Sequence, residues 1–261
     1  MKTSILIVTH AKDKEWLEPC LKSIFKFCSG FHEVVVALPN RDKAELFPIL
    51  TRYPVKSWGF DEVEGHGFNH HQAVICMADQ ICEDADLILH VDVDCMFVEP
   101  VTLQDYIIND KPVLLIENYE RFRTVHPGVF YWKQCTEKAL GMPCTYETMR
   151  RHPAVHWKET YCKTREMVES AHKKPFLQYM LEQKDSFPQT VSEFNMLGSV
   201  AAHFYKDRYH IIDLEHQARP KDKLIQFWSH GGLNYICDKN HWLVKNRTVT
   251  ARQVAIELGV I

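Results

Sequence analysis

Apolar residues recur along the first hundred positions in two alternating patterns. Uninterrupted apolar runs, typical of strands buried on both faces, predict strands over 5–10, 33–39 and 87–94, with a shorter strand over 55–58. Between these runs, apolar residues return every three or four positions, which predicts helices over 15–27, about 43–50 and 68–82. This alternation predicts an α/β fold with one doubly wound, mostly parallel central sheet flanked by helices.

After Pro100 the alternation weakens. Apolar runs predict further strands over 112–116, 128–132 and 209–214. The region 146–185 is expected to be mainly helical with breaks at its prolines, and Ser192 is expected to cap a helix running to about 205. Asn40 is a similar candidate cap for the helix near 43. We therefore expect a single domain, 1–261, with halves 1–100 and 101–261 and a helical insertion in the second half.

The composition is that of an ordinary globular protein, with 261 residues, 46% hydrophobic and 25% charged. No apolar run approaches the roughly 18 residues that a membrane-spanning helix needs. The run 5–8 is too short for a signal-peptide core. Nine cysteines, an odd number without a CxxC pair, favour a reducing compartment over a disulfide framework. We expect a cytoplasmic protein without a transmembrane segment.

Two carboxylates, Asp92 and Asp94, follow the apolar run that starts at Leu87. Ligands of open α/β sheets bind at the carboxyl ends of the strands. Carboxylate oxygens there suit Mg²⁺ or Mn²⁺ holding a diphosphate. The sequence therefore predicts a metal site, against the alternative of solvated carboxylates at a strand–loop junction.

The net charge of −3 hides a basic segment. From Arg121 to Lys174 there are eleven Lys or Arg and five Glu, a balance of +6 that leaves −9 for the rest of the chain. Aromatic residues are interleaved in this segment. It is suited to an anionic partner such as a phosphorylated glycan or nucleic acid, or it is a solvated helical face with aromatics in the core. Both interpretations stay open.

The strand–helix alternation, the Asp92-Val93-Asp94 motif and the late pair His230-Gly231 resemble the GT-A family of metal-dependent glycosyltransferases. The resemblance covers most of the chain. The segments 149–153 and 192–194 are similar to a bacterial and phage branch of these enzymes. The resemblance implies a nucleotide-sugar-binding half at 1–100, an acceptor half at 101–261, and transfer of a hexose from a nucleotide-diphosphate sugar, with uridine as the base, in a bacterial or phage-infected cell.

The resemblance also implies roles for individual residues. The metal ligands would be Asp92, Asp94 and His230, holding Mn²⁺ or Mg²⁺. The donor would be contacted by Thr9, His10, Asp13, Asn69, His70, Gln72 and Asp92. The acceptor would be contacted by Arg150, Arg151, His152 and Trp157. Catalysis would involve Asp94 and Glu193.

Chemistry supports some of these assignments independently. A divalent ion stabilises negative charge on a leaving diphosphate, and inversion at the sugar carbon needs a carboxylate base such as Glu193. Glu193 also suits the first turn of a helix for electrostatic reasons alone. If configuration is retained no base is needed, and Glu193 would position the sugar. His230 stands out among fifteen histidines because two glycines follow it and allow a tight turn.

Other classes remain as alternatives. A haloacid-dehalogenase-like phosphatase would use Asp92 as its nucleophile, but its motif usually lies near the N-terminus. A sugar-1-phosphate nucleotidyltransferase would carry a glycine-rich loop after the first strand, and 9–14 contains no glycine. A non-catalytic sugar-nucleotide-binding protein would have no need of both aspartates. For the acceptor, a 5-hydroxymethylpyrimidine in DNA and a surface glycan both stay open.

Overall fold

The computed structural model describes residues 1–125, 128–150, 153–183, 191–227, 232–234, 241, 243–245 and 247–261. It is an α/β protein whose strands pair mostly in parallel and are flanked by helices. The chain forms two compact units: unit 1 contains 1–3, 62–89 and 106–219, and unit 2 contains 4–61, 90–105 and 220–261. The chain passes between the two units several times along its sequence.

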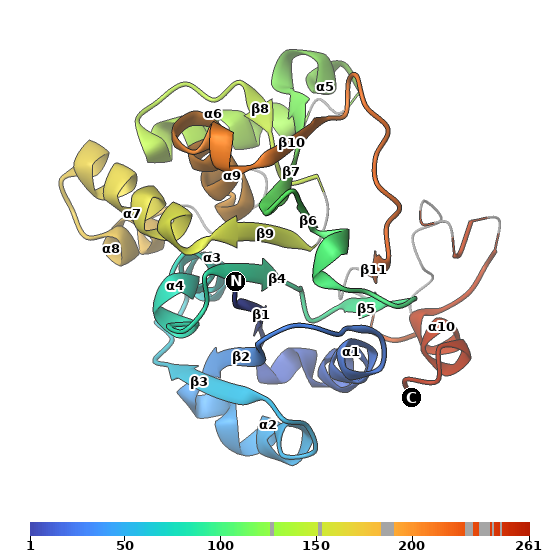
Figure 1. Ribbon diagram of the computed structural model, residues 1–261. Helices are drawn as coiled ribbons and strands as arrows, with labels where there is room; N and C mark the ends of the chain where they lie inside the picture. The colour runs from blue at the N-terminus through green and yellow to red at the C-terminus, as the bar shows by residue number, and fades with distance from the viewer. Residues whose placement is uncertain are drawn as a thin grey trace. The chain divides into compact units, whose positions relative to one another are not determined.

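Unit 2 is built on parallel strands in the order β3-β2-β1 (Figure 1). These are β1 (Thr3–Val8), β2 (Glu33–Pro39) and β3 (Lys56–Phe60), connected through α1 (Lys14–Phe27) and α2 (Lys43–Leu50). Every residue of β1 is buried, and so are all but the first of β2. Burial on both faces explains why these strands appear in the sequence as unbroken apolar runs.

Strand β4 (Leu87–His90) runs parallel to β1. The N–H of Leu87 donates to the carbonyl oxygen of Lys2, and the N–H of Val91 donates to that of Leu6. Both partners advance by four residues in the same direction, as in a parallel ladder. The carboxyl ends of β1 and β4 therefore lie at the same edge of the sheet.

The rest of unit 2 contains β5 (Cys95–Phe97) and β11 (Leu224–Gln226), which pair antiparallel. It also contains α10 (Ala251–Glu257), the red helix of Figure 1. The sequence pattern did not predict α10. Its start is fixed by a capping box, in which Thr250 Oγ1 accepts from the backbone of Gln253 and Gln253 Oε1 accepts from that of Thr250.

Unit 1 has its own strands. They are β6 (Ile107–Ile108), β7 (Lys111–Asn118), β8 (Tyr146–Glu147), β9 (Ala154–Trp157) and β10 (His210–Asp213). Strand β7 pairs in parallel with β10 and antiparallel with β6 and β8, while β9 is the neighbour of β4. A small core cluster against β7 joins Leu114 and Ile116 to Ala201 and Tyr209.

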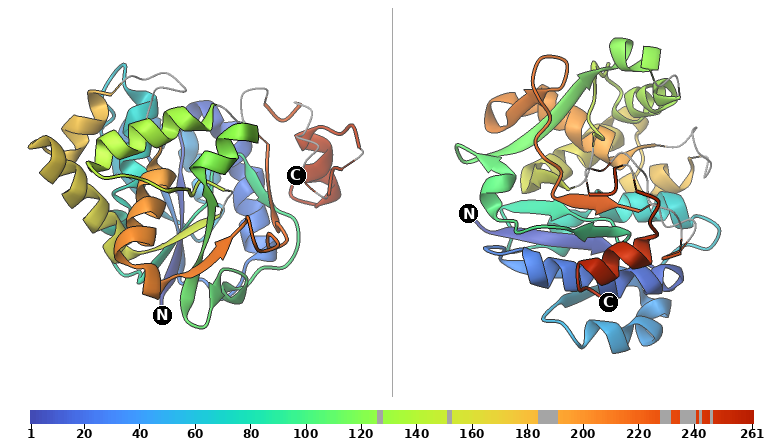
Figure 2. Two further views of the ribbon diagram at one scale, coloured as in Figure 1. Left: turned by 90° about the horizontal axis from the view of Figure 1, so that it is seen from above. Right: turned by 90° about the vertical axis from the view of Figure 1, so that its right-hand side faces the viewer.

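The helices of unit 1 are α3 (Gly67–Ile75), α4 (Ala78–Ile81), α5 (Tyr119–Val125), α6 (Val129–Leu140), α7 (Lys158–His172), α8 (Phe176–Leu181) and α9 (Glu193–Phe204). Helices α6, α7 and α9 pack against one another (Figure 2, lime to orange). Short 3-10 helices occur at Ala11–Asp13, Asn40–Asp42, Leu103–Asp105 and Lys206–Arg208. Among the residues described, no helix has the length and apolarity needed to cross a membrane.

The strand predicted over 87–94 ends at His90, and the region 146–185 contains the strands β8 and β9 before its helices. Two other predicted elements differ more strongly from the structure. The strand predicted over 128–132 is wrong, because this run starts α6. Its buried residues Val129, Thr136 and Leu140 recur at helical spacing, so packing overrides the strand preference of the aromatic run. The helix predicted over 68–82 is broken after Cys76. Helix α3 ends at Ile75 and α4 begins at Ala78, and between them the Cys76 carbonyl accepts a hydrogen bond from Arg165 Nη1 at 2.6 Å.

The two predicted caps have different outcomes. Ser192 is confirmed as the cap of α9, since its Oγ accepts the N–H of Asn195 at 3.3 Å. Asn40 is not the cap of α2. Its side-chain amide instead donates to Asp61 Oδ1 at 2.6 Å, and Asp42 takes the cap position without a side-chain hydrogen bond.

Candidate metal and donor site

Asp92 and Asp94 lie in unit 2, in the turn that joins β4 to β5. The N–H of Cys95 donates to the Asp92 carbonyl at 3.0 Å and closes this turn. Asp94 is 7% exposed, so its carboxylate is held largely out of water. The predicted placement of both carboxylates just beyond the carboxyl end of a buried strand is therefore what the structure shows.

Strand β11 and the residue after it are hydrogen-bonded to the same turn. Gln226 is paired with Cys95 in the ladder, and its side-chain Nε2 donates to Asp92 Oδ2 at 3.1 Å. The N–H of Phe227 donates to the Asp94 carbonyl at 3.0 Å. The Phe227 ring stacks on Trp16 of α1 with centroids 5.8 Å apart. The chain just before His230 is thus bonded to both aspartates, although His230 itself lies outside the described residues.

Two buried thiols lie against these aspartates. Cys20 Sγ is 3.9 Å from the Asp92 carbonyl, and Cys95 Sγ is 3.9 Å from Asp94 Oδ1. Burial raises the pKa of both thiols well above the usual value, and the nearby carboxylates raise it further. Because metals bind the thiolate and not the thiol, carboxylate oxygens are the ligands that this turn offers.

Three predicted donor-binding residues follow β1 in unit 2. Thr9 is fully buried, and its Oγ1 has no hydrogen-bond partner among the described residues. The buried ring of His10 meets Phe60 edge-on at 6.4 Å. Asp13 ends the 3-10 helix and donates its N–H to the His10 carbonyl at 3.0 Å. These residues follow the strand next to β4, so they lie at the sheet edge that carries the aspartates.

The chemistry of the donor set fits a hard cation. Within the described part of the chain, no group of three or more His, Cys, Asp or Glu side chains converges as a complete metal cage. Mg²⁺ sites commonly use only one or two carboxylates and complete their shell with water and substrate phosphates. Asp92 and Asp94 match that smaller protein contribution.

The other predicted donor-binding residues lie on α3 in unit 1. Asn69 Nδ2 donates to the Gln183 carbonyl at 2.9 Å, and His70 Nδ1 accepts the N–H of Val63 at 3.1 Å. All three side chains are buried, and Gln72 Oε1 has no hydrogen-bond partner among the described residues. Asn69 and His70 therefore help to hold unit 1 together, while Gln72 keeps a buried acceptor unused.

Glu193 opens α9, directly after the cap Ser192. Its side chain is half-buried, and its charge contributes to the raised pKa of Cys76, after burial as the main cause. The structure describes this residue within unit 1, and its role as a base stays a prediction.

Arg150, a predicted acceptor-binding residue, makes its contacts with other residues of unit 1. Its guanidinium donates to Glu117 Oε2 at 2.9 Å and to Glu147 Oε2 at 3.4 Å. The same group lies 4.1 Å from the centroid of Phe122. Arg150 thus joins β7 to β8, which is a structural task. Arg151 and His152 lie outside the described residues.

Glu147 was missed by the sequence analysis. It is 1% exposed, and burial raises its pKa to about 7, although Arg150 and hydrogen bonds from Met149 and Asn195 act in the opposite direction. A carboxyl group that titrates near neutral pH is a candidate for proton transfer or for pH-dependent stability. Nothing in the sequence around Tyr146-Glu147 distinguishes it from a surface glutamate.

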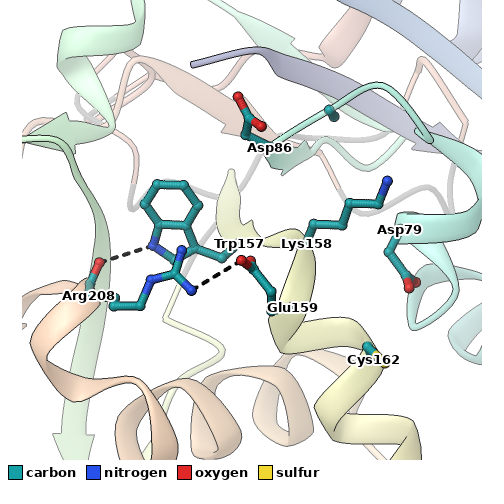
Figure 3. Close-up of a pocket in the computed structure, with 8 residues that line it drawn as sticks. Asp79, Asp86, Trp157, Lys158, Glu159, Cys162 and Arg208 are labelled. Carbon is teal, nitrogen blue, oxygen red and sulfur yellow. Dashed lines mark hydrogen bonds and ion pairs between the residues drawn. The ribbon is translucent and has the colours of Figure 1, made fainter.

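Trp157, the last predicted acceptor residue, lines a cavity of about 430 Å³ in unit 1 (Figure 3). The cavity is lined by Asp79, Ala85, Asp86, Trp157, Lys158, Glu159, Cys162 and Arg208. Its charged groups bond within the protein: Arg208 to Glu159 at 3.2 Å, Asp79 to Arg165 at 2.5 Å, and Asp86 to the N–H of Lys2 at 2.7 Å.

The position of this cavity along β4 matters for the acceptor prediction. The N–H of Lys158 donates to the Asp86 carbonyl, so Trp157 and Lys158 lie at the amino end of β4. Acceptor binding by Trp157 stays a prediction.

The basic segment between Arg121 and Lys174 is largely neutralised inside unit 1. Five carboxylates from outside the segment pair with its cations: Asp79, Glu117, Glu120, Glu182 and Glu215. They reduce its sequence balance of +6 to +1. The interpretation as a solvated, internally paired face is therefore favoured over that of an anion-binding surface.

Comparison with known proteins adds no identification. No family model matches the chain, and no curated protein matches it either.

Proposed function

We propose that this protein is a metal-dependent glycosyltransferase that moves a hexose from a nucleotide-diphosphate sugar to an acceptor hydroxyl. The observation that carries the proposal is the turn after β4. There Asp92 and Asp94 follow a strand parallel to β1, and they are bonded to Gln226 at the end of β11 and to Phe227 just after it. This is where open α/β sheets bind their ligands.

Asp92 and Asp94 would hold Mn²⁺ or Mg²⁺. The ion would act as a Lewis acid on the diphosphate and stabilise the charge that develops as the sugar leaves. Thr9 and His10 follow the neighbouring strand, and their contact with the nucleotide rests on the family resemblance, since both are buried. Uridine as the base and Glu193 as the acceptor base rest on the family resemblance.

The described residues on both sides of His230 belong to unit 2. Before His230, the last described residue is Phe227, whose N–H donates to the Asp94 carbonyl. After His230, the first described residue is Gly232. Gly232 has a φ of +64°, which favours glycine, and a Cβ there would lie 2.5 Å from Glu15 Oε1. His230 is three residues from Phe227, and a chain of three residues spans at most about 10 Å. His230 as a third ligand therefore remains part of the proposal.

A glycan is the acceptor that the paired charges favour over DNA. Phosphate backbones are bound mainly through unpaired Lys and Arg, and the basic segment has most of its charge compensated. We also place the reaction in the cytoplasm. The eight cysteines in the described part of the chain are free thiols, which suits a reducing compartment.

The test is thermal unfolding with uridine, guanosine, cytidine and thymidine diphosphates, each with and without Mn²⁺. A ligand that binds only the folded state raises the melting temperature. We expect stabilisation by one diphosphate, uridine diphosphate, and only with Mn²⁺. Asp92→Asn and Asp94→Asn should abolish it, whereas Asp84→Asn, an exposed carboxylate before the same strand, should not. No shift with any diphosphate, together with phosphate-ester hydrolysis that Asp92→Asn removes, would favour the phosphatase.

A further inference from the structure

We propose that Gln226 is a positioning residue that fixes the Asp92 carboxylate for metal binding. The inference rests on the proposed metal-dependent function and assigns a role to a residue outside the predicted site. Its basis is the 3.1 Å hydrogen bond from Gln226 Nε2 to Asp92 Oδ2, which joins residues 134 positions apart.

The backbone around Gln226 is fixed at three successive residues. Ile225 pairs with Met96 and Gln226 with Cys95 in the β11–β5 ladder, and the N–H of Phe227 donates to the Asp94 carbonyl. Ile225 and Phe227 are buried, at 2% and 1% exposure. Successive side chains of a strand point to opposite faces. Gln226 therefore points away from these apolar neighbours, on the face that reaches Asp92.

The chemistry of the amide suits this task. An amide N–H fixes the direction of a carboxylate through one oxygen but brings no charge, so the carboxylate keeps its full negative charge for a cation. A Lys or Arg at the same place would compete with the metal for that charge. Hydrogen-bond partners of this kind orient metal ligands, and their loss commonly weakens metal binding by about 10- to 100-fold.

The same bond also explains a constraint between distant parts of the chain. Strands β5 and β11 pair through their backbones, which does not depend on the side chain at position 226. The bond to Asp92 does depend on it, because it needs a long side chain that ends in a neutral donor. Methionine has nearly the same length and volume as glutamine and lacks the donor. Gln226→Met therefore removes the hydrogen bond while keeping the packing.

The experiment measures Mn²⁺ binding to the full-length protein by electron paramagnetic resonance of free Mn²⁺, without any sugar nucleotide. Unfolding in EDTA is measured in parallel. We expect Gln226→Met to bind Mn²⁺ about 10- to 100-fold more weakly than the wild type, with an unchanged melting temperature in EDTA. Gln226→Asn, which keeps the amide but is one methylene shorter, should show the same loss. Gln217→Met is the matched control, because this glutamine is exposed and its side-chain Oε1 accepts the backbone N–H of Asp213 at 3.0 Å.

The outcomes separate the two proposals. If the wild type binds Mn²⁺ and Asp92→Asn does not, but Gln226→Met binds as tightly as the wild type, the positioning role is overturned and the metal site stands. If the wild type itself does not bind Mn²⁺, the metal-dependent function and the role of Gln226 both fall. If Gln226→Met fails to fold, Gln226→Asn carries the same test.

Discussion

The carboxylate of Glu147 and the guanidinium of Arg150 lie 3.4 Å apart in unit 1, with Glu147 almost fully buried. Burial dominates over this attraction and raises the pKa of Glu147 to about 7. In the unfolded chain the same carboxyl group titrates near its usual value of about 4.3. The folded state therefore binds more protons than the unfolded state between these values, and the contribution of Glu147 to stability falls as the pH rises through this window.

We expect Glu147→Gln to be progressively more stable than the wild type as the pH rises from 5 to 8.5. The amide mimics the protonated acid and has no charge to bury, and the raised pKa corresponds to a gain of about 3 kcal/mol when deprotonation is complete. Urea unfolding at several pH values measures this difference. A difference that is constant with pH would contradict the prediction.

Two comparisons make this test specific. Glu117→Gln removes the other carboxylate partner of Arg150, and it should destabilise the protein by leaving that guanidinium less well paired.

Buried His156 has a pKa lowered to about 3 by burial, so its contribution to stability is lost as the pH falls below about 6.5. Because His156 is present in both proteins, its pH-dependent contribution cancels when the free energies of unfolding of the wild type and Glu147→Gln are subtracted.

Tyr209→Phe should destabilise the protein by about 1–3 kcal/mol, because it leaves buried polar groups without a partner. The Tyr209 hydroxyl lies 2.8 Å from Thr160 Oγ1, accepts the N–H of Trp157 at 3.1 Å and lies 3.3 Å from His156 Nδ1. Chemical denaturation measures the loss. Tyr131→Phe, at a tyrosine that is 47% exposed, is the control and should change little. Equal stability of the two variants would show that the Tyr209 bonds contribute nothing.

Gly198→Ala should destabilise the protein by about 1–3 kcal/mol through overpacking, even though alanine favours helices. A Cβ at Gly198 would lie 2.1 Å from Thr148 Oγ1. Thr148 has little freedom to move, since its Oγ1 donates to the Phe194 carbonyl and its N–H to Asn195 Oδ1. Gly128→Ala, where no atom lies within 4 Å of the added Cβ, should be neutral. The free energies of unfolding of both variants decide the matter.

The elements predicted most reliably are those whose burial produces an apolar pattern within a few consecutive residues. The strand over 33–39 and the helix over 43–50 have the predicted bounds, because a strand covered on both faces leaves an unbroken apolar run and a helix with one buried side leaves a periodic pattern. The Asp-x-Asp pair was found because it interrupts such a run.

Other features depend on contacts that no local window contains. The position of Gln226 matters only because β11 returns beside β5, and Glu147 is unusual only because Arg150, Asn195 and the surrounding core enclose it. Arg165 bonds to the Cys76 carbonyl, where the predicted helix is interrupted, from 89 residues away. The aromatic run from Val129 is a local preference that packing overrules. Long-range packing and polar contacts therefore account for what the sequence analysis missed.

Weak binding to DNA is the remaining expectation. Because Arg121 pairs with Glu215 and Lys174 with Glu182, these cations of the basic segment are compensated and less able to displace counterions from a phosphate backbone. A fluorescent duplex that contains 5-hydroxymethylcytosine should not be retained at about 0.15 M salt, with or without uridine diphosphate and Mn²⁺. Glu182→Gln and Glu215→Gln together should release cations and make weak, strongly salt-dependent binding appear. Tight, salt-dependent binding by the wild type would instead identify DNA as the acceptor, since it would mean that these ion pairs open to bind phosphate.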